Sequence, residues 1–206
     1  MELPLTLSSI GLCIFAYLVG SVSTAILVCR VFAYPDPRSE GSNNPGTTNV
    51  LRIAGKVPAL LTLAGDIAKG VIPVLIGRWL LKDDYILAMM GFCAFLGHLF
   101  PIFFNFEGGK GVATALGVIT TLAWPIGLAV MLIWLIVAVL SRISSLSALI
   151  SWALAPLIVH LYMEQIFYPI LAMSVFLIFR HHENIKKLVT GTESRIGAKS
   201  SQESTP

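Results

Sequence analysis

Long apolar runs, separated by short polar stretches, constrain this chain more than any other feature of its sequence. A helix of about 20 apolar residues crosses the ~30 Å hydrocarbon core of a bilayer, and several runs reach that length. Of the 206 residues, 56% are hydrophobic and 12% are charged, which gives more apolar surface than a soluble domain of this size can bury. The runs lie at residues 5–29, 60–81, 85–104, 112–140, 145–162 and 166–179. We therefore expect an all-α, polytopic integral membrane helix bundle.

A break in one run and the placement of basic residues determine the predicted topology. Trp124 and Pro125 interrupt the run 112–140 near its middle, and a break there gives seven transmembrane helices. The polar segment 30–56 carries four Lys or Arg side chains, so the positive-inside rule places it in the cytoplasm and the N-terminus in the periplasm. The basic C-terminal tail then lies in the cytoplasm. We expect one transmembrane domain over residues 1–197 and a disordered tail over residues 198–206.

The segment NFEGGKGVAT, residues 105–114, predicts an anion-binding loop. Its three glycines let backbone N–H groups approach a bound group closely and permit positive φ. Lys110 and the N-terminus of a helix expected to start near Val112 add positive charge at the same place. The segment is not a P-loop, because the first glycine and the final Ser or Thr of that motif are missing. Taken alone, it is also compatible with a tight turn between two membrane helices.

Two other polar clusters, residues 36–55 and 180–197, are predicted to share the cytoplasmic side with this loop. The first is rich in Arg, Ser, Thr and Asn, whose side chains donate the hydrogen bonds that phosphate oxygens accept. The alternative is a polar connector whose arginines only set the topology. The second places His181 and Asn184 three residues apart, on one face of an interfacial helix. Its alternative is a basic helix that anchors in lipid headgroups.

Three ionisable residues lie within or at the end of apolar runs, where such residues are functional candidates by default. Asp66 and Lys69 are three residues apart, and we favour a neutralising pair inside the bundle over a direct contact with substrate. We interpret His98, at the end of the next run, as packed support for the loop that follows.

Several kinds of chemistry lack the residues they require. The aspartates do not form the carboxylate cluster of a Mg²⁺–diphosphate site, and the sequence contains neither a His-x4-Asp motif nor a Gly-x-Ser-x-Gly elbow. The three cysteines show no metal-ligand spacing and no disulfide framework. A net charge of +3 is too small to indicate a nucleic-acid partner. What remains is a site without metal or cofactor, suited to a substrate that carries phosphate.

Three motifs together resemble the bacterial acyl-phosphate-dependent glycerol-3-phosphate acyltransferases. They are GSNNPGTTNVLR at residues 41–52, the stretch 97–114 from Gly-His to GGKGVAT, and HHENI with GTE within residues 181–193. The resemblance covers nearly the whole chain and implies a seven-helix enzyme of the bacterial inner membrane whose active site faces the cytoplasm. It implies transfer of a fatty acyl group from acyl phosphate to the 1-hydroxyl of sn-glycerol 3-phosphate, which yields lysophosphatidic acid and phosphate. It also implies functional coupling to an enzyme that forms acyl phosphate.

The resemblance implies roles for residues in all three motifs. The catalytic set is Arg38, Ser42, His181 and Asn184; the substrate-binding set is Asn44, Thr48, Asn49, Arg52, Gly108, Gly109, Lys110, Gly111 and Thr114; and Glu193 is a structural carboxylate. The chain departs from the family pattern at three positions. Asn43 stands where the family usually has Gly, Thr47 where it has Ala, and Glu107 where a Lys precedes the glycines. Asn43 tolerates positive φ better than most residues, whereas Glu107 places an anion beside the expected phosphate site.

The predicted mechanism is direct attack, because an acyl phosphate is already activated. The glycine-rich loop and Lys110 would hold glycerol 3-phosphate, while Arg38, Ser42 and Arg52 gather the charge of the departing phosphate. The proton of the attacking hydroxyl goes to a substrate phosphate oxygen, which we favour, or to His181. Two alternatives are an anion channel or carrier, and an acyltransferase that uses acyl-CoA or acyl carrier protein as donor.

Overall fold

The computed structural model describes residues 7–196, and within that range every regular element is a helix. The prediction of an all-α fold is confirmed; the predicted tail over residues 198–206 lies outside the described residues. The elements are α1 (Leu7–Gly20), α2 (Thr24–Val31), α3 (Thr47–Ala54), α4 (Lys56–Leu80), α5 (Asp84–Leu99), the 3-10 turn η1 (Ile102–Phe104), α6 (Val112–Leu122), α7 (Trp124–Ser141), α8 (Ser144–Tyr162), the 3-10 turn η2 (Glu164–Ile166), α9 (Phe167–Arg180) and α10 (His182–Val189).

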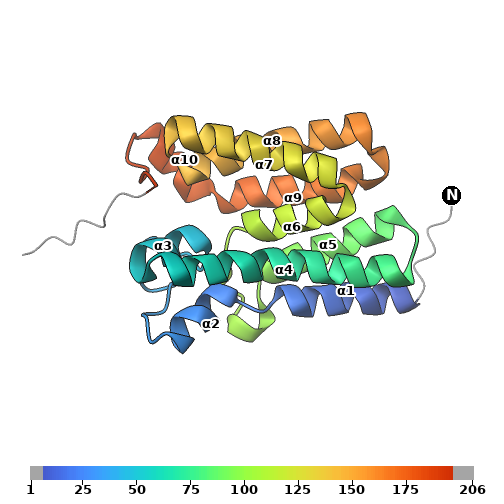
Figure 1. Cartoon of the computed structure of the whole chain (residues 1–206), viewed down its shortest axis with the longest axis horizontal. Coiled ribbons are helices and arrows are strands. Elements are labelled where there is room, and N and C mark those ends of the chain that lie inside the picture. Colours follow the sequence, from blue (N-terminus) through green and yellow to red (C-terminus); the bar gives the residue numbers. More distant parts are fainter. Residues whose placement is uncertain (1–6, 197–206) are drawn as a thin grey trace, which may run out of the picture.

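The long helices run along the long axis of the molecule, and the chain reverses direction from one to the next (Figure 1). The connections between α4 and α5, α6 and α7, and α8 and α9 lie at one end. The opposite half of the molecule, at the left of Figure 1, holds α3 and α10 at its end and, nearer the middle, the loop from η1 to α6; these segments contain the three polar clusters. The fold therefore gathers these clusters in one half of the bundle, although the chain separates them by many residues.

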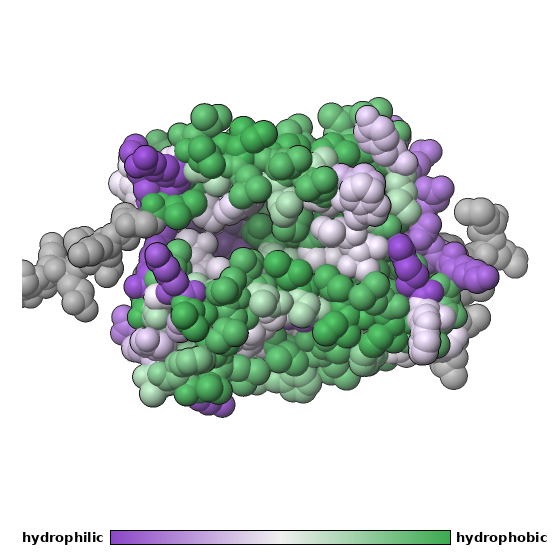
Figure 2. Space-filling view, viewed as in Figure 1, coloured by the Kyte–Doolittle hydropathy of each residue, from purple (hydrophilic) through white to green (hydrophobic). Residues whose placement is uncertain are grey.

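The surface and the helix lengths make this a multi-pass membrane protein. Five segments are long and apolar enough to span a bilayer: Ser8–Val31, Lys56–Leu80, Asp84–Phe104, Trp124–Ser141 and Ser144–Tyr162. Figure 2 shows apolar side chains over the middle of one face and hydrophilic side chains at its two ends. The remaining long-axis helices, α6 and α9, have 11 and 14 residues. Seven spans therefore stay a prediction.

The predicted interruption of the run 112–140 is present. Helix α6 ends at Leu122, Ala123 is extended with φ −148° and ψ 90°, and α7 begins at Trp124. Pro125 sits in the first turn of α7, where its missing N–H costs no hydrogen bond. Most residues of α6 are buried, because it packs against α4, α5 and α7.

The run predicted as one helix over residues 5–29 contains a break that hydropathy does not show. Helix α1 ends at Gly20 and α2 begins at Thr24. The Lys69 ammonium of α4 donates a hydrogen bond of 3.0 Å to the Val22 carbonyl within the break. Lys69 also forms a buried ion pair of 2.8 Å with Asp66, as expected for a neutralising pair. A partner from another helix thus satisfies backbone that a membrane interior would otherwise leave unpaired.

Small residues let α1 approach α5 closely. A Cβ atom on Gly20 would lie 2.0 Å from the Ala94 carbonyl oxygen, and one on Gly97 would lie 2.2 Å from the Tyr17 carbonyl oxygen. Neither position can hold a larger side chain without separating the helices. This contact fixes the end of α5, which leads through η1 into the loop at residues 105–111.

Candidate active site

The glycine-rich loop, residues 105–111, joins η1 to α6. Asn105 and Phe106 turn the chain with φ of 56° and 60°, and Gly111 has φ of 83° directly before α6 begins at Val112. The expected helix start is confirmed. Only glycine adopts the Gly111 conformation without steric cost, so this residue sets the direction in which the N-terminus of α6 faces.

His98 forms the floor beneath this loop. Its carbonyl accepts a hydrogen bond of 3.2 Å from the Gly109 N–H, and a Cβ atom on Gly109 would lie 2.3 Å from its Nε2 atom. The other ring nitrogen, Nδ1, lies 3.3 Å from the Thr114 hydroxyl and 3.6 Å from Asp66. His98 is buried between these groups. The geometry is that of support for the loop, as expected from the sequence.

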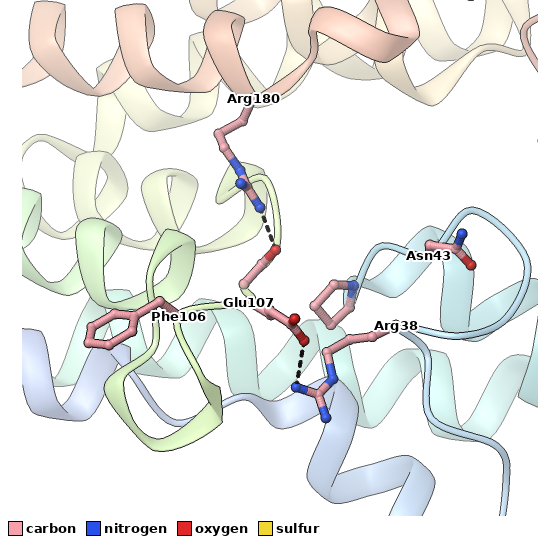
Figure 3. A pocket seen from close by; sticks show the side chains of 7 residues that line it. Arg38, Asn43, Phe106, Glu107 and Arg180 are labelled. Carbon is pink, nitrogen blue, oxygen red and sulfur yellow. Dashed lines mark hydrogen bonds and ion pairs between the residues drawn. The ribbon is translucent and has the colours of Figure 1, made fainter.

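Arg180, the last residue of α9, holds the loop from the other side. Its guanidinium donates to the carbonyls of Gly108 and Gly109 at 2.6 and 3.2 Å (Figure 3). Among residues 7–196, the N–H groups of Gly108, Lys110 and Gly111 have no acceptor, and the first turn of α6 adds further free donors. Arg180 therefore binds two carbonyls of the loop, and the unpaired N–H groups remain available to an anion.

A chain of hydrogen bonds starts at Lys110 and connects the second motif to the third. Its ammonium donates to Asn184 Oδ1 at 2.5 Å, and Asn184 Nδ2 donates to Glu193 Oε1 at 2.8 Å. The same carboxylate oxygen accepts from the Ser145 hydroxyl at 2.9 Å. Glu193 therefore fixes which end of the Asn184 amide faces Lys110.

The surroundings of Lys110 lower the pKa of its ammonium group. Burial lowers the pKa of Lys110 to about 8, with the nearby Lys187, Arg180 and Arg52 acting in the same direction and Glu193 opposing them. An anion that arrives here meets several positive charges within one small region.

His181, which follows Arg180, has one ring nitrogen bound and one available. Its Nδ1 atom lies 2.8 Å from the Leu177 carbonyl; since a carbonyl only accepts, Nδ1 carries the proton and Nε2 is left as an acceptor. Burial lowers the pKa of His181 to about 4. The imidazole is therefore neutral at pH 7.

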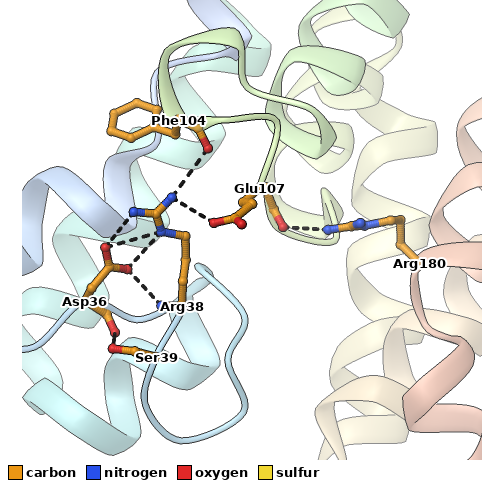
Figure 4. Close-up of polar contacts among 7 residues, drawn as sticks. Asp36, Arg38, Ser39, Phe104, Glu107 and Arg180 are labelled. Atoms are coloured by element: carbon orange, nitrogen blue, oxygen red, sulfur yellow. Dashed lines mark hydrogen bonds and ion pairs between the residues drawn. The ribbon is translucent and has the colours of Figure 1, made fainter.

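Arg38 lies on the other side of the loop, in contact with two carboxylates (Figure 4). Its guanidinium is 2.8 Å from Asp36 and 3.0 Å from Glu107, and it also donates to the Phe104 carbonyl at 3.4 Å. The hydrogen bond from Arg38 lowers the pKa of Asp36. Arg38 thus ties the first polar cluster to the glycine-rich loop.

A cavity of about 350 Å³ opens between these elements. Figure 3 shows Arg38 and Asn43 on one side of it, Arg180 on the other, and Glu107 between them. Its lining residues are Arg38, Asn43, Pro45, Phe106, Glu107, Gly108 and Arg180. The cavity is large enough for a small phosphorylated compound.

Other predicted site residues shape the first cluster. Asn49 is buried: its amide donates to the carbonyls of Pro37 and Glu40 at 2.9 Å each, and its oxygen accepts from the Ser42 N–H at 2.8 Å. This side chain organises the loop, so a direct contact between Asn49 and substrate stays a prediction. The Thr48 hydroxyl lies 3.3 Å from the Ser144 hydroxyl.

Three more predicted site residues differ in burial and in whether their side chains have hydrogen-bond partners. Thr114 is fully buried against His98, and Ser42 is exposed. Arg52 is half-buried, and its guanidinium forms no hydrogen bond or ion pair with any described residue. Arg52 and Ser42 therefore have donors to offer to a ligand, whereas the Thr114 hydroxyl supports the loop floor.

The three departures from the family pattern have distinct structural outcomes. Asn43 adopts φ of 54°, so its tolerance of positive φ is used, as expected. Thr47 begins α3, and its buried hydroxyl has no partner among the described residues. Glu107 pairs with Arg38.

Sequence reasoning missed Arg180 and Asp36 as members of the site. Arg180 belongs to the third polar cluster but stands outside the predicted catalytic and substrate-binding sets, although it directly follows the last apolar run and precedes His181. Asp36 lies two residues before Arg38. The signal for each was its position next to a predicted site residue, but only the fold shows that Arg180 reaches the loop at residues 105–111.

Comparison with known proteins gives one consistent family. A sequence model for the family "Glycerol-3-phosphate acyltransferase" matches residues 10–191. A glycerol-3-phosphate acyltransferase of Methylococcus capsulatus is 54% identical over 187 residues, which are 90% of this chain and 94% of that protein. One of Vibrio cholerae serotype O1 is 49% identical over 201 residues, or 98% of this chain and 95% of the other.

Solved structures agree with the sequence comparisons. The crystal structure of PlsY (YgiH), an integral membrane glycerol 3-phosphate acyltransferase, in its glycerol 3-phosphate form, superposes with a TM-score of 0.88 at 37% identity. That similarity covers 92% of this chain and 96% of the other. The lysophosphatidic acid form of PlsY gives a TM-score of 0.84 at 36% identity.

Proposed function

Because this chain belongs to the glycerol-3-phosphate acyltransferase family, we propose that it transfers a fatty acyl group from acyl phosphate to the 1-hydroxyl of sn-glycerol 3-phosphate. The family membership makes it an acyltransferase of phospholipid biosynthesis. The finer proposal concerns the donor, the hydroxyl and the products, which are lysophosphatidic acid and inorganic phosphate. No nucleic-acid partner is proposed, and an enzyme that forms acyl phosphate is the expected functional partner.

The observation that carries the proposal is the convergence of Lys110 with free backbone donors. Lys110 lies between Asn184 and the N-terminus of α6, and the N–H groups of Gly108 and Gly111 are unpaired among residues 7–196. A helix N-terminus, free N–H groups and an ammonium together favour a phosphate. We assign the phosphate of glycerol 3-phosphate to this place.

We assign the phosphate of the acyl donor to the three arginines near the cavity. Arg52 has no protein partner among the described residues, and Arg38 and Arg180 flank the cavity. Guanidinium groups bind phosphate oxygens through two parallel hydrogen bonds. They stabilise the charge that builds up on phosphate as it leaves.

The reaction needs one bond to form and one to break. The oxygen of the 1-hydroxyl attacks the acyl carbonyl carbon, the bond from that carbon to the phosphate oxygen breaks, and the phosphate departs with both electrons. The hydroxyl proton goes to a phosphate oxygen, whose pKa is about 6. His181, with a pKa of about 4, is a weaker base, and its neutral Nε2 serves better as a hydrogen-bond acceptor that orients the hydroxyl.

We further propose seven spans in the bacterial inner membrane, with the polar clusters toward the cytoplasm. Three observations support this: the direction of the chain alternates through α1, α4, α5, α6, α7, α8 and α9; the clusters share one half of the molecule; and that half carries most of the basic residues. Buried short helices are tolerated at membrane depth when protein surrounds them, as it surrounds α6.

The test is acyl transfer by the purified protein in detergent or lipid. Chemically made palmitoyl phosphate and palmitoyl-CoA are compared as donors to sn-glycerol 3-phosphate, with the Lys110→Ala variant as control. We expect lysophosphatidic acid from the phosphate alone. Product only from palmitoyl-CoA would keep the acyltransferase and overturn the donor. Folded protein that gives no product from either donor would favour an anion carrier.

A further inference from the structure

Arg38 stands out because each of its guanidinium nitrogens is already bound by the protein. Nε lies 3.1 and 3.2 Å from the two Asp36 oxygens, and Nη2 is 2.8 Å from Asp36 Oδ2. Nη1 is 3.0 Å from Glu107 Oε2 and 3.4 Å from the Phe104 carbonyl. Nη2 keeps one free N–H, but both N–H groups of Nη1 have acceptors. A phosphate that takes two parallel hydrogen bonds from Nη1 and Nη2 must therefore displace an acceptor from Nη1.

The two carboxylates differ in how firmly they hold Arg38. Asp36 comes from the same loop as Arg38 and binds the guanidinium through both carboxylate oxygens. It also accepts a hydrogen bond of 2.9 Å from the backbone N–H of Arg38. Glu107 comes from the glycine-rich loop, binds through one oxygen, and its side chain is 65% exposed. An exposed ion pair made by a long side chain is weak, so Glu107 is the acceptor that can be exchanged.

Glu107 is also placed where it meets an incoming substrate. It lines the same cavity as Arg38 and Arg180 (Figure 3) and is the only carboxylate among the residues that line it. A phosphate with two negative charges is repelled by that carboxylate while Glu107 stays on Arg38. Once Glu107 turns away, the same phosphate gains the Nη1 edge of Arg38.

We propose that Glu107 is a specificity-determining residue that competes with the phosphate of the acyl donor for the Nη1 edge of Arg38. The inference rests on the proposed function. Glu107 sets the affinity for acyl phosphate through this exchange and has no contact with the reacting atoms.

A purely structural role for the Arg38–Glu107 pair makes a different prediction. The glycine-rich loop is already held by Arg180 at two carbonyls and by His98 at Gly109. Arg38 also binds the carbonyl of Phe104, the η1 residue directly before the loop. Loss of the Glu107 charge therefore leaves the loop in place. If the ion pair served only to stabilise the fold, its loss would lower the melting temperature and would not improve binding of a phosphate.

The test is Glu107→Gln, which keeps the size and one oxygen of the side chain and removes its charge. We expect KM for palmitoyl phosphate and the inhibition constant of inorganic phosphate to fall about two- to fivefold, as loss of a weak exposed charge contact allows. The expected change in kcat and in KM for glycerol 3-phosphate is less than about twofold. Glu164→Gln, which removes an exposed carboxylate in η2 at the other end of the molecule, serves as matched control and should change none of these.

An unchanged or higher KM for palmitoyl phosphate in the Glu107→Gln protein would overturn the inference, and so would a lower melting temperature with unchanged KM. Failure of the proposed function looks different, because the wild-type protein would then give no product from palmitoyl phosphate. Calorimetric binding of inorganic phosphate to the wild-type and Glu107→Gln proteins still decides the inference in that case. Tighter binding to the variant supports it, and equal or weaker binding overturns it.

Discussion

Lys110 shows how the surroundings of one side chain set its chemistry. The ammonium is half-buried among several other cations, and its pKa of about 8 lies well below that of a lysine in water. It is therefore charged at pH 7 but poorly solvated. A phosphate that arrives beside it regains the lost interactions, so binding energy is concentrated at this position.

Replacement of Lys110 by Ala should raise KM for glycerol 3-phosphate at least about tenfold, because loss of a hydrogen bond to a charged group costs about 1.5–3 kcal/mol. In the wild-type protein the same KM should rise as the pH increases through about 8, since Lys110 loses its proton there. Steady-state kinetics between pH 6.5 and 9.5 measure both effects. Lys110→Arg is the control: its charge persists, so the alkaline rise should disappear. An unchanged KM in Lys110→Ala would remove this residue from the site.

Glu193 is hydrogen-bonded to Asn184, which in turn accepts from Lys110, so under the proposed function it acts on the substrate through these two residues. Glu193→Ala should lower kcat/KM about tenfold or more, because the Asn184 amide is then free to turn its donor toward Lys110. Glu193 also raises the pKa of Lys110, so the alkaline rise in KM should move to lower pH. Ser145→Ala, which removes another hydrogen bond to the same carboxylate, should change kcat/KM less than about threefold. A pH profile identical to that of the wild-type protein would contradict this role for Glu193.

The sequence predicts candidate site residues, but it does not predict the hydrogen bonds that connect them. The motifs that contain Lys110, Asn184 and Glu193 pointed to phosphate chemistry. Their hydrogen bonds join residues up to 74 positions apart, and no local pattern encodes such a pairing. Arg180 was missed for the same reason, because its two acceptors are carbonyls, which every residue carries.

At the scale of elements, the two helix breaks differ in what causes them. The break at residue 123 depends on a local signal, a proline in the first turn of α7, and could be predicted. The break between α1 and α2 depends on Lys69, which belongs to α4. Hydropathy is continuous through this break, so the sequence predicts one helix over residues 5–29. The structure shows two, because a distant side chain satisfies the exposed Val22 carbonyl.

Lys69→Met should destabilise the protein by about 3–5 kcal/mol, because it leaves the buried Asp66 charge without its partner. It also removes the donor to Val22. The double variant Asp66→Asn with Lys69→Met should recover part of the loss, since no unpaired charge remains. Unfolding in detergent measures both, and Lys56→Met, at an exposed position in the same helix, is the control. A Lys69→Met protein as stable as the wild type would show that the pair contributes nothing to the fold.

At the scale of the whole molecule, the distribution of charge predicted which segments lie together. The bias of Lys and Arg toward a few loops put the three polar clusters on one side, and the fold places them in one half of the molecule. Charge bias could not show that α6 is a short, buried helix of 11 residues. In Figure 1 the loop that precedes α6 lies nearer the middle of the molecule than α3 does, and α6 starts from there.

The seven-span topology can be tested against a five-span one, in which α6 and α9 do not cross. Single cysteines replace the exposed residues Ser39, Lys82 and Gln165 in a protein whose three native cysteines are changed to serine. A thiol reagent that cannot cross membranes is applied to intact cells after the outer membrane has been made permeable. With seven spans, positions 82 and 165 react in intact cells, and position 39 reacts only after lysis. With five spans, position 165 changes sides while position 82 does not, because α6 and α9 both follow residue 82. Labelling at position 165 therefore decides whether α6 crosses the bilayer, because α6 precedes this position and α9 follows it. Arg38 and Lys110 both precede α6 and lie on the same side in either topology.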